Sequence, residues 1–340
     1  MDQWGREGVK MDKQRTLRAV GAVCATLVVG AAAANAALSQ THDSEARARV
    51  DIVVPADPGG GWDLVAREAQ HAMRLNDIVA NTQVVNLPGA GGTIGLAQTV
   101  RREGEATTLM TTGTVMIGGI IVNDSAQTLE DVVPIARVAD DYEVFVVRDD
   151  SPLQDMNDLI EAWEDDPGAV AVGGGSLGGT DHLLAGLAAQ SQGLRPTDVN
   201  YIPFAGGAQA LTSLLSGSID VGVSGYNEFS DQVETGSLRV LGVSAHERVT
   251  GLEEHPTLPE QGVDAVLPNW RGFMAPPGIT EEERAELTAI VEEMVATPEW
   301  QDTLERNRWD DTFQSGPEFE AFLKEEITRI TEVTKDLGLS

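Results

Sequence analysis

The chain has 340 residues, 41% of them hydrophobic and 23% charged, a balance that indicates a globular protein with room for two domains and excludes a disordered one. Its 54 acidic residues outnumber its 23 basic ones, and the formal charge of −31 argues against nucleic acid and anionic lipid as partners. Lysine is almost absent beyond residue 36, while acids are spread along the whole chain. This pattern predicts a halophilic protein that stays soluble in concentrated salt, where self-repulsion is screened.

The N-terminus predicts an export signal over residues 1–36. Basic residues at positions 10, 13, 15 and 18 precede an apolar stretch over 19–34, and Ala34-Asn35-Ala36 offers a small-x-small cleavage site. The stretch is too short and too rich in alanine to favour a permanent membrane span. Cleavage near Ala36 removes the single cysteine, Cys24, which excludes disulfides, zinc thiolates and a cysteine nucleophile. A lipid anchor at Cys24 is the alternative, for which the preceding residues are a poor match.

The predicted elements alternate along most of the chain. After a polar linker over 37–48, strands are expected at 50–54, 83–87 and 108–112, and helices at 63–75 and 93–102. This alternation predicts a mostly parallel α/β sheet. A second α/β block follows, with strands at 143–147, 169–172, 199–202, 220–223 and 238–243 and a helix at 156–163. Two further helices are expected at 280–296 and 316–337, the last with an apolar face that packs against the core.

Glycine-rich segments follow several of the predicted strands and precede helical stretches. Pro58-Gly59-Gly60-Gly61, Pro88-Gly89-Ala90-Gly91-Gly92 and Pro203-Phe204-Ala205-Gly206-Gly207 occupy this place. A strand, a glycine turn and a helix N-terminus together present free backbone N–H groups and a positive dipole end, which suits an anion. Because such segments occur in both blocks, we expect two similarly built domains whose glycine loops face each other across a cleft for a small polyanion.

Read together, the motifs resemble one family of receptors. They are V-P-A-x-P-G-G-G-W-D at 54–63, P-G-A-G-G-T-I-G-L-A-Q at 88–98, G-G-G-S-x-G-G-T-D-H at 173–182, N-Y-I-P-F-x-G-G at 200–207 and N-W-R-G at 269–272. In this order they are similar to substrate-binding proteins of tripartite tricarboxylate transporters, the family that includes the Bug receptors. The variants around Trp62 and Arg271 look most like the citrate-type branch.

The resemblance implies a fold and a function. The fold is a type II periplasmic binding protein of Venus-flytrap form, with a ligand cleft between two mixed α/β domains. Domain 1 is expected over 49–141 and 246–340, and domain 2 over 142–245. The function is that of a monomeric periplasmic receptor, without cofactor or metal, that captures citrate or another tricarboxylate, or a dicarboxylate. It delivers this cargo to a small and a large membrane subunit.

The candidate ligand-binding residues lie in the glycine loops and at the ends of neighbouring strands. Alternative roles are a helix cap for Asp63, a packed or solvated ring for His182, a core ring for Phe204, an internal hydrogen bond for Tyr226 and a structural ion pair for Arg271. The full set is Pro58, Gly59, Gly60, Gly61, Trp62, Asp63, Gly89, Ala90, Gly91, Gly92, Thr93, Ser176, Gly178, Gly179, Thr180, His182, Phe204, Ala205, Gly206, Gly207, Ser224, Tyr226 and Arg271.

One enzymatic interpretation competes with a receptor. Residues 174–178 fit the pattern G-x-S-x-G, in which Ser176 would be the nucleophile of a secreted serine esterase or hydrolase. Asp220 and either His246 or His255 would complete a triad in the right chain order. No H-G-G-G-type oxyanion segment accompanies the pattern, and the receptor motif explains the same glycines. We therefore expect a binding protein rather than an enzyme.

Overall fold

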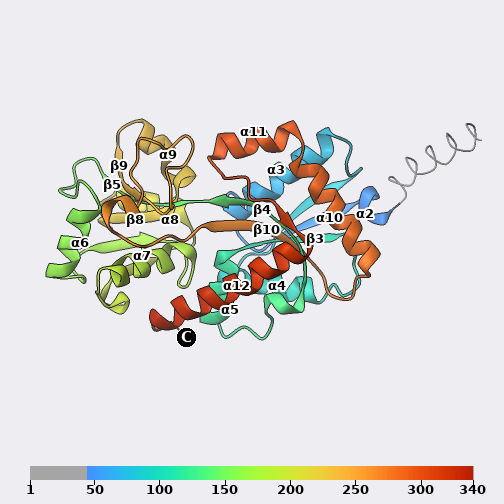
Figure 1. Ribbon diagram of the computed structural model, residues 1–340, viewed down its shortest axis with the longest axis horizontal. Coiled ribbons are helices and arrows are strands. Elements are labelled where there is room, and N and C mark those ends of the chain that lie inside the picture. Colours follow the sequence, from blue (N-terminus) through green and yellow to red (C-terminus); the bar gives the residue numbers. More distant parts are fainter. Residues whose placement is uncertain (1–43, 340) are drawn as a thin grey trace, which may run out of the picture.

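The computed structural model describes residues 44–339, which form two lobes joined by extended crossing segments (Figure 1). The predicted export signal over 1–36 and the first part of the linker lie outside the described residues. The end of that linker is ordered, since Glu45–Ala48 forms the short helix α2. Arg47 on α2 is buried and pairs with Glu286 and Glu293, which ties this helix to the body of the protein.

Lobe 1 is built on a six-stranded sheet in the order β11-β4-β10-β3-β1-β2. Its parallel part contains β1 (Val50–Val54), β2 (Thr82–Asn86) and β3 (Thr108–Gly113), and its antiparallel part contains β4 (Val133–Asp141), β10 (Asn269–Ala275) and β11 (Gln314–Ser315). The covering helices are α3 (Gly61–Leu75), α4 (Thr93–Val100), α5 (Thr114–Val122), α10 (Glu281–Val295), α11 (Pro298–Asn307) and α12 (Gly316–Asp336). Strands β1, β3 and β10 are rich in buried residues because helices cover both faces of the sheet.

Lobe 2 is built on a five-stranded sheet in the order β7-β6-β8-β5-β9. Its strands are β5 (Glu143–Arg148), β6 (Ala171–Gly174), β7 (Asn200–Pro203), β8 (Val221–Gly225) and β9 (Leu238–Val243). Its helices are α6 (Met156–Asp165), α7 (Thr180–Ser191), α8 (Gly207–Leu215) and α9 (Tyr226–Glu234). Most of the predicted elements are therefore present within a few residues of their expected positions.

Both sheets are mixed, which confirms two mixed α/β domains, whereas the narrower prediction of a mostly parallel sheet over the first block holds only for β1, β2 and β3 and not for the β4, β10 and β11 that join them. β4 passes through Tyr142 directly into β5, which carries the chain from one sheet to the other, and β10 returns to pair antiparallel with β4. β4 leaves the sheet of lobe 1, and β10 re-enters that sheet beside β4. The two strands therefore run in opposite directions. Sheet membership changes between Asp141 and Glu143 and again after Val243. The exact domain limits stay a prediction.

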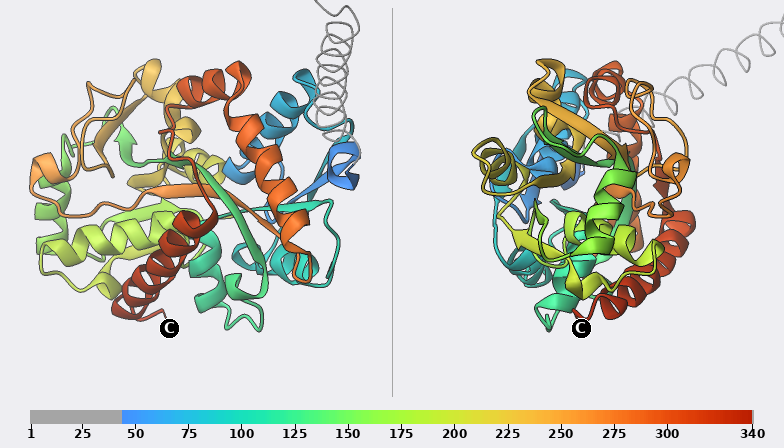
Figure 2. Two further views of the ribbon diagram at one scale, coloured as in Figure 1. Left: turned by 45° about the vertical axis from the view of Figure 1, so that its right-hand side comes forward. Right: turned by 90° about the vertical axis from the view of Figure 1, so that its left-hand side faces the viewer.

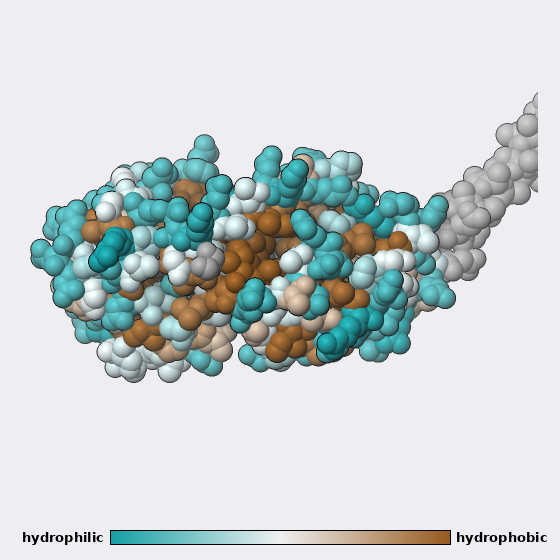
Figure 3. Space-filling model, turned by 90° about the horizontal axis from the view of Figure 1, so that it is seen from below, coloured by the Kyte–Doolittle hydropathy of each residue, from teal (hydrophilic) through white to brown (hydrophobic). Residues whose placement is uncertain are grey.

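The last helix connects the two lobes on the side of the molecule. The start of α12 packs its Phe319 edge-on against Trp270 of β10, with 5.9 Å between ring centroids. Just beyond its end, Leu337 packs against Gly186 of α7 in lobe 2. The views in Figure 2 show this helix running along both lobes. From below, polar residues cover most of the surface and apolar residues gather toward the middle (Figure 3). None of the helices within 44–339 is both long and apolar enough to span a bilayer.

Candidate functional site

A cavity of about 450 Å³ lies between the two lobes. Lobe 1 contributes the segments that follow β1 and β2, and lobe 2 contributes those that follow β6, β7 and β8. The crossing strands β4, β5 and β10 supply Asp141, Glu143, Asn269 and Arg271 to its wall. Segments far apart in the sequence therefore meet here because the carboxyl ends of parallel strands lie at the same edge of each sheet.

Five helices begin at this cavity, and glycine is the N-cap residue of each. These helices are α3, α4, α7, α8 and α9, and their N-caps are Gly60, Gly92, Gly179, Gly206 and Gly225. All five glycines line the cavity. None of these helices has a side-chain hydrogen bond from its N-cap, so backbone N–H groups of their first turns remain available at the positive ends of the helix dipoles.

Helices that begin elsewhere are mostly capped by their own side chains. Asp155 caps α6, Thr280 caps α10 with a capping box, and Thr297 caps α11. Ser and Thr at the N-cap normally satisfy first-turn donors and stabilise a helix. The absence of such caps on the five helices at the cavity leaves donors for a bound anion, the arrangement on which helix N-terminal anion sites depend.

Close packing explains why two of the cavity positions need glycine. Gly92 has a φ of +97°, and a Cβ there would lie 2.8 Å from the Trp62 ring and 2.9 Å from Cε of Met116. A Cβ at Gly61 would lie 2.6 Å from Nη2 of Arg271. Trp62 is buried and its Nε1 has no hydrogen-bond partner among the described residues. The first glycine loop thus packs directly against the cation of β10.

Arg271 forms the structural ion pair considered from the sequence, and its contact with a ligand stays a prediction. Its side chain lines the cavity, and its Nη2 donates to Oδ2 of Asp141 at 3.0 Å in a buried ion pair. Its Nε has no partner within the described residues. Burial raises the pKa of Asp141, and the neighbouring guanidinium opposes that rise. Arg271 therefore neutralises an acid of its own fold and still presents a donor near the cleft.

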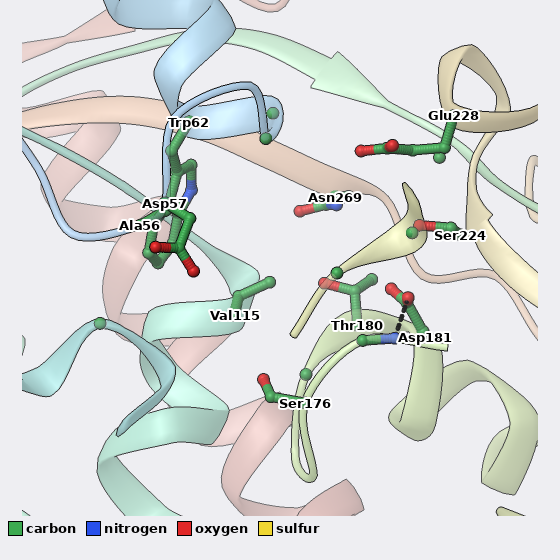
Figure 4. Close-up of a pocket in the computed structure, with 18 of the residues that line it drawn as sticks. Ala56, Asp57, Trp62, Val115, Ser176, Thr180, Asp181, Ser224, Glu228 and Asn269 are labelled. Atoms are coloured by element: carbon green, nitrogen blue, oxygen red, sulfur yellow. Dashed lines mark hydrogen bonds between the residues drawn. The ribbon is translucent and has the colours of Figure 1, made fainter. Parts of the chain in front are cut away.

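Carboxyl groups line the lobe 2 side of the cavity. Figure 4 shows Asp181 and Glu228 here, together with Asn269, Ser224 and Thr180. Oδ2 of Asp181 accepts from the backbone N–H of Gly175 at 2.5 Å, and burial raises the pKa of Asp181 to about 6. Burial also raises the pKa of Glu228.

Glu143 is the most deeply buried of these acids. Its Oε1 accepts from Nδ2 of Asn269 at 2.6 Å, whereas its Oε2 has no partner among the described residues. Burial, with Asp181 and Asp141 adding to it, raises the pKa of Glu143 well above its ordinary value. The cavity therefore offers donors mainly from its glycine loops and Arg271, and acceptors mainly from these acids.

Most of the residues predicted from the sequence line this one cavity. They come from four glycine loops and from strands β8 and β10, and the structure brings them together. They are Gly59, Gly60, Gly61, Trp62, Gly89, Ala90, Gly91, Gly92, Ser176, Gly179, Thr180, Ala205, Gly206, Gly207, Ser224 and Arg271.

Seven of the predicted residues do not line the cavity: Pro58, Asp63, Thr93, Gly178, His182, Phe204 and Tyr226. Asp63 points into the lobe, where it accepts from the N–H of Gly59, from Nε of Arg67 and from Nδ2 of Asn86 at 2.7–2.9 Å. These hydrogen bonds hold the first glycine loop against α3 and β2. Oγ1 of Thr93 donates to the carbonyl of Ala90 at 3.0 Å, which closes the second loop in the same way.

The rings among these seven pack inside lobe 2. Nδ1 of His182 accepts from the N–H of Gly178 at 3.1 Å, its ring stacks on Tyr201 at 4.3 Å, and burial lowers its pKa to about 4. Phe204 packs against the core of the lobe, and Tyr226 is buried beneath the guanidinium of Arg308. A histidine held neutral in this way supports the loop rather than the ligand.

Sequence reasoning missed the acids of the cavity wall. Asp141 and Glu143 flank the crossing from β4 to β5, Asp181 follows the glycine loop of α7, and Glu228 lies in the first turn of α9. An acid at the start of a strand, directly before the apolar run 144–147, was the available signal at Glu143. The other cavity residues outside the predicted set are Pro55, Ala56, Asp57, Leu64, Pro88, Val115, Gly175, Gly225, Asn227, Asn269 and Trp309.

The geometry does not assemble the triad of the enzymatic alternative. Ser176 lines the cavity, but no hydrogen bond within residues 44–339 joins it to His246 or His255. Oδ2 of Asp220 accepts from the N–H of Ala171 at 2.9 Å, and the ring of His255 lies against Tyr226 behind the cavity wall. Within the same residues, no group of three acidic, histidine or cysteine side chains is placed to hold a metal ion.

Comparisons with known proteins agree with this architecture. Residues 65–339 match the tripartite tricarboxylate transporter family receptor. The chain is 27% identical to Protein BugT of Bordetella pertussis over 96% of this chain and 99% of that protein. A TctC solute-binding protein from Polaromonas, solved without ligand, superposes with a TM-score of 0.68 at 29% identity, over 86% of this chain and all of that one.

A further solved structure shares the fold at lower identity. MatC from Rhodopseudomonas palustris, solved with bound malate, has a TM-score of 0.73 at 22% identity, over 84% of this chain and 98% of that one. The neighbours are periplasmic binding proteins with the same mixed α/β architecture. From these matches and the fold, this chain belongs to the receptor family of the tripartite tricarboxylate transporters.

Proposed function

We propose that this receptor captures a small carboxylate in the cavity between its lobes and delivers it to a small and a large membrane subunit of a transporter. The observation that carries the proposal is the convergence of five helix N-termini without side-chain caps on one cavity. Oriented N–H groups bind an anion locally even though the molecule as a whole is strongly acidic. Arg271 adds a guanidinium to these donors.

The resemblance favours citrate or another tricarboxylate as cargo, and a dicarboxylate is the second choice. The malate bound by MatC is a dicarboxylate, which keeps this second choice open. The cavity of about 450 Å³ has room for either class with ordered water. A fully ionised tricarboxylate would bring its negative charges close to the acids on the lobe 2 side of the cavity.

Capture is expected to work by closure of two domains, 49–141 with 246–340 and 142–245. The loops after β1 and β2 hold one end of the ligand, and the loops after β6, β7 and β8 contact the other. A ligand that touches both domains favours the closed state through its additional contacts there. The proposal places the mature chain, cleaved near Ala36, as a monomer in the periplasm.

Thermal unfolding of residues 37–340 in molar salt tests the proposal. The panel is citrate, isocitrate, tricarballylate, malate, succinate, glutamate and benzoate. A ligand at 100 times its dissociation constant is expected to stabilise the fold by about 2.7 kcal/mol. Arg271→Met should abolish that shift. Arg195→Met, which removes an exposed arginine paired only with Asp198, should leave it unchanged.

Two results would count against the receptor. The first is the absence of a shift with every carboxylate in the panel. The second is hydrolysis of a small ester that disappears in Ser176→Ala, because a receptor should show no turnover before or after that substitution.

A further inference from the structure

Acidic side chains outnumber basic ones in the cavity wall, and most of these acids belong to lobe 2. Among residues 44–339, Arg271 is the one cation of the wall, and it is paired with Asp141. Four more acids line the cavity, Asp57 from lobe 1 and Glu143, Asp181 and Glu228 from lobe 2, and none of them forms a salt bridge with another residue in the described part of the chain. A buried carboxylate is normally paired with a cation or protonated. The wall therefore lacks a positive partner at its lobe 2 side.

Two buried acceptor atoms at this place lack donors. Oε2 of Glu143 and Oδ1 of Asn269 have no hydrogen-bond partner within residues 44–339, and these side chains are only 1% and 5% exposed. Both residues line the cavity, and they are joined to each other through the bond from Nδ2 of Asn269 to Oε1 of Glu143. That bond orients the amide so that its free atom is an oxygen. Both free atoms therefore call for a donor from outside the chain.

The helix N-termini at the cavity also differ in charge, because some of their first turns contain an acid and others do not. The first turns of α4 and α8 contain no acid, so they remain open to a ligand carboxylate. The first turns of α7 and α9 already contain Asp181 and Glu228. An additional carboxylate beside these two helices would meet like charge in a water-poor site. Helix N-termini with and without an acid thus line the same cavity.

We propose that Glu143, Asp181, Glu228 and the Oδ1 atom of Asn269 form a subsite for an ammonium group, so that the cargo is a small carboxylate that also carries a protonated amine. This inference rests on the proposed function of the cavity and narrows its cargo. It replaces the third carboxylate of a tricarboxylate with a cationic nitrogen. The amine satisfies both orphaned acceptors and balances the acids, while the ligand carboxylate binds the glycine loops.

The protonation of the acids supports the same assignment. Burial raises the pKa of Glu143 and of Asp181, so both carboxyls bind protons more readily than in water. An ammonium group beside them lowers these pKa values and releases protons on binding, whereas an added carboxylate raises them and takes protons up. The direction of proton exchange therefore distinguishes the two kinds of cargo.

The experiment uses matched ligands that differ at one substituent. Residues 37–340 are titrated by calorimetry at pH 7 in molar salt with succinate, malate and aspartate, and with glutarate, 2-hydroxyglutarate and glutamate. The amine of each series is expected to bind at least about tenfold more tightly than its hydroxyl and unsubstituted partners. Repeating the titration in buffers with different ionisation heats should show proton release.

Single substitutions test which residues cause the preference for the amine. Glu143→Gln keeps the shape of the side chain and an acceptor for Asn269, and it should reduce the ratio of aspartate to succinate affinity by at least about tenfold. Glu247→Gln removes an exposed acid away from the cavity and should leave the preference unchanged. Unfolding of each unliganded variant checks that it is folded.

The outcomes separate this inference from the proposed function. If succinate, malate or citrate binds as tightly as the amines, or with proton uptake, the ammonium subsite is wrong while the carboxylate receptor stands. If Glu143→Gln keeps the full preference, the assignment of the acids is wrong. If no carboxylate of either kind binds, the proposed function fails together with the subsite.

Discussion

Arg271 illustrates how one residue serves both the fold and the site. Its ion pair with Asp141 stabilises the junction where β4 leaves lobe 1, and its guanidinium packs against Gly61 of the first glycine loop. The buried acid fixes the guanidinium, so its remaining donors are held in place before a ligand arrives. The ion pair thus orients the guanidinium that we propose as a ligand contact.

Asp181 should make the stability of the unliganded protein depend on pH. Its carboxyl has a pKa of about 6 in the folded chain, against an ordinary value of 3.8, because burial disfavours the ion. The folded state therefore holds this proton more strongly, and the contribution of Asp181 to stability falls as the pH rises from about 4 to 6. Above that window the buried ion destabilises the fold, and below it the carboxyl is neutral in both states.

Asp181→Asn is expected to remove this penalty. The amide oxygen of asparagine can still accept from the N–H of Gly175, and no charge is buried. The unliganded variant should be more stable than the parent by on the order of 1–3 kcal/mol at pH 7.5 and equally stable near pH 4. Urea unfolding at several pH values measures the difference. A gain of the same size at both pH values would show that ionisation of Asp181 is not its cause.

The uncapped helices at the cavity give an element-scale prediction. Gly206, the N-cap of α8, has an extended backbone (φ 171°, ψ 177°), and a Cβ there would meet no atom within 4 Å. A serine at this position can cap the helix with its own hydroxyl. Gly206→Ser should therefore stabilise the unliganded protein by a few tenths to about 1 kcal/mol and weaken carboxylate binding, because the hydroxyl occupies donors that the ligand needs.

Asp155 provides the matched control, since it caps α6 away from the cavity. Asp155→Ala should cost about 1 kcal/mol of stability and leave the affinity unchanged. Unfolding and ligand titration of both variants compare the N-terminus of α8 with the N-terminus of α6. If Gly206→Ser binds the ligand as tightly as the parent, the N-terminus of α8 does not contact the carboxylate.

Local patterns were sufficient to predict most helices and strands. The apolar spacing of α3, α10 and α12 and the valine-rich β1 locate these elements directly from the sequence. The helix α5 was missed because its residues, Thr114–Val122, are apolar almost throughout and show no helical period. Strands β4 and β10 were missed as strands because their pairing with each other joins residues more than 100 positions apart.

The cavity wall was predictable where it consists of local sequence patterns, as most helices and strands were. Its glycine loops are contiguous motifs, so their residue types and order identify them. Its acids come from separate elements, and only the fold places Glu143 of β5, Asp181 of α7 and Glu228 of α9 around one cavity. Sequence motifs therefore predicted most of the loops that line the cavity but not the acids around them.

At the scale of the whole molecule, the chain combines a continuous core with an acidic surface. One cluster of buried apolar side chains includes residues from both lobes, and α12 contributes Phe319, Leu323 and Ile330 to it. The surface in Figure 3 is mostly polar, and acids exceed bases by 54 to 23 over the sequence. The apolar core favours compaction, and repulsion between surface carboxylates opposes it.

The balance between these two forces should depend on salt. Raising NaCl from 0.1 M to 1 M shortens the Debye length from about 10 Å to about 3 Å, which screens repulsion between most surface charges. The melting temperature of unliganded residues 37–340 should therefore rise steadily over this range at pH 7. The few exposed ion pairs, such as Arg195 with Asp198, lose strength at the same time, but exposed pairs contribute little. Tetramethylammonium chloride at equal ionic strength is the control for ion-specific effects. A melting temperature that stays constant or falls in both salts would contradict adaptation to concentrated salt, because repulsion among the surface carboxylates would then have no measurable cost.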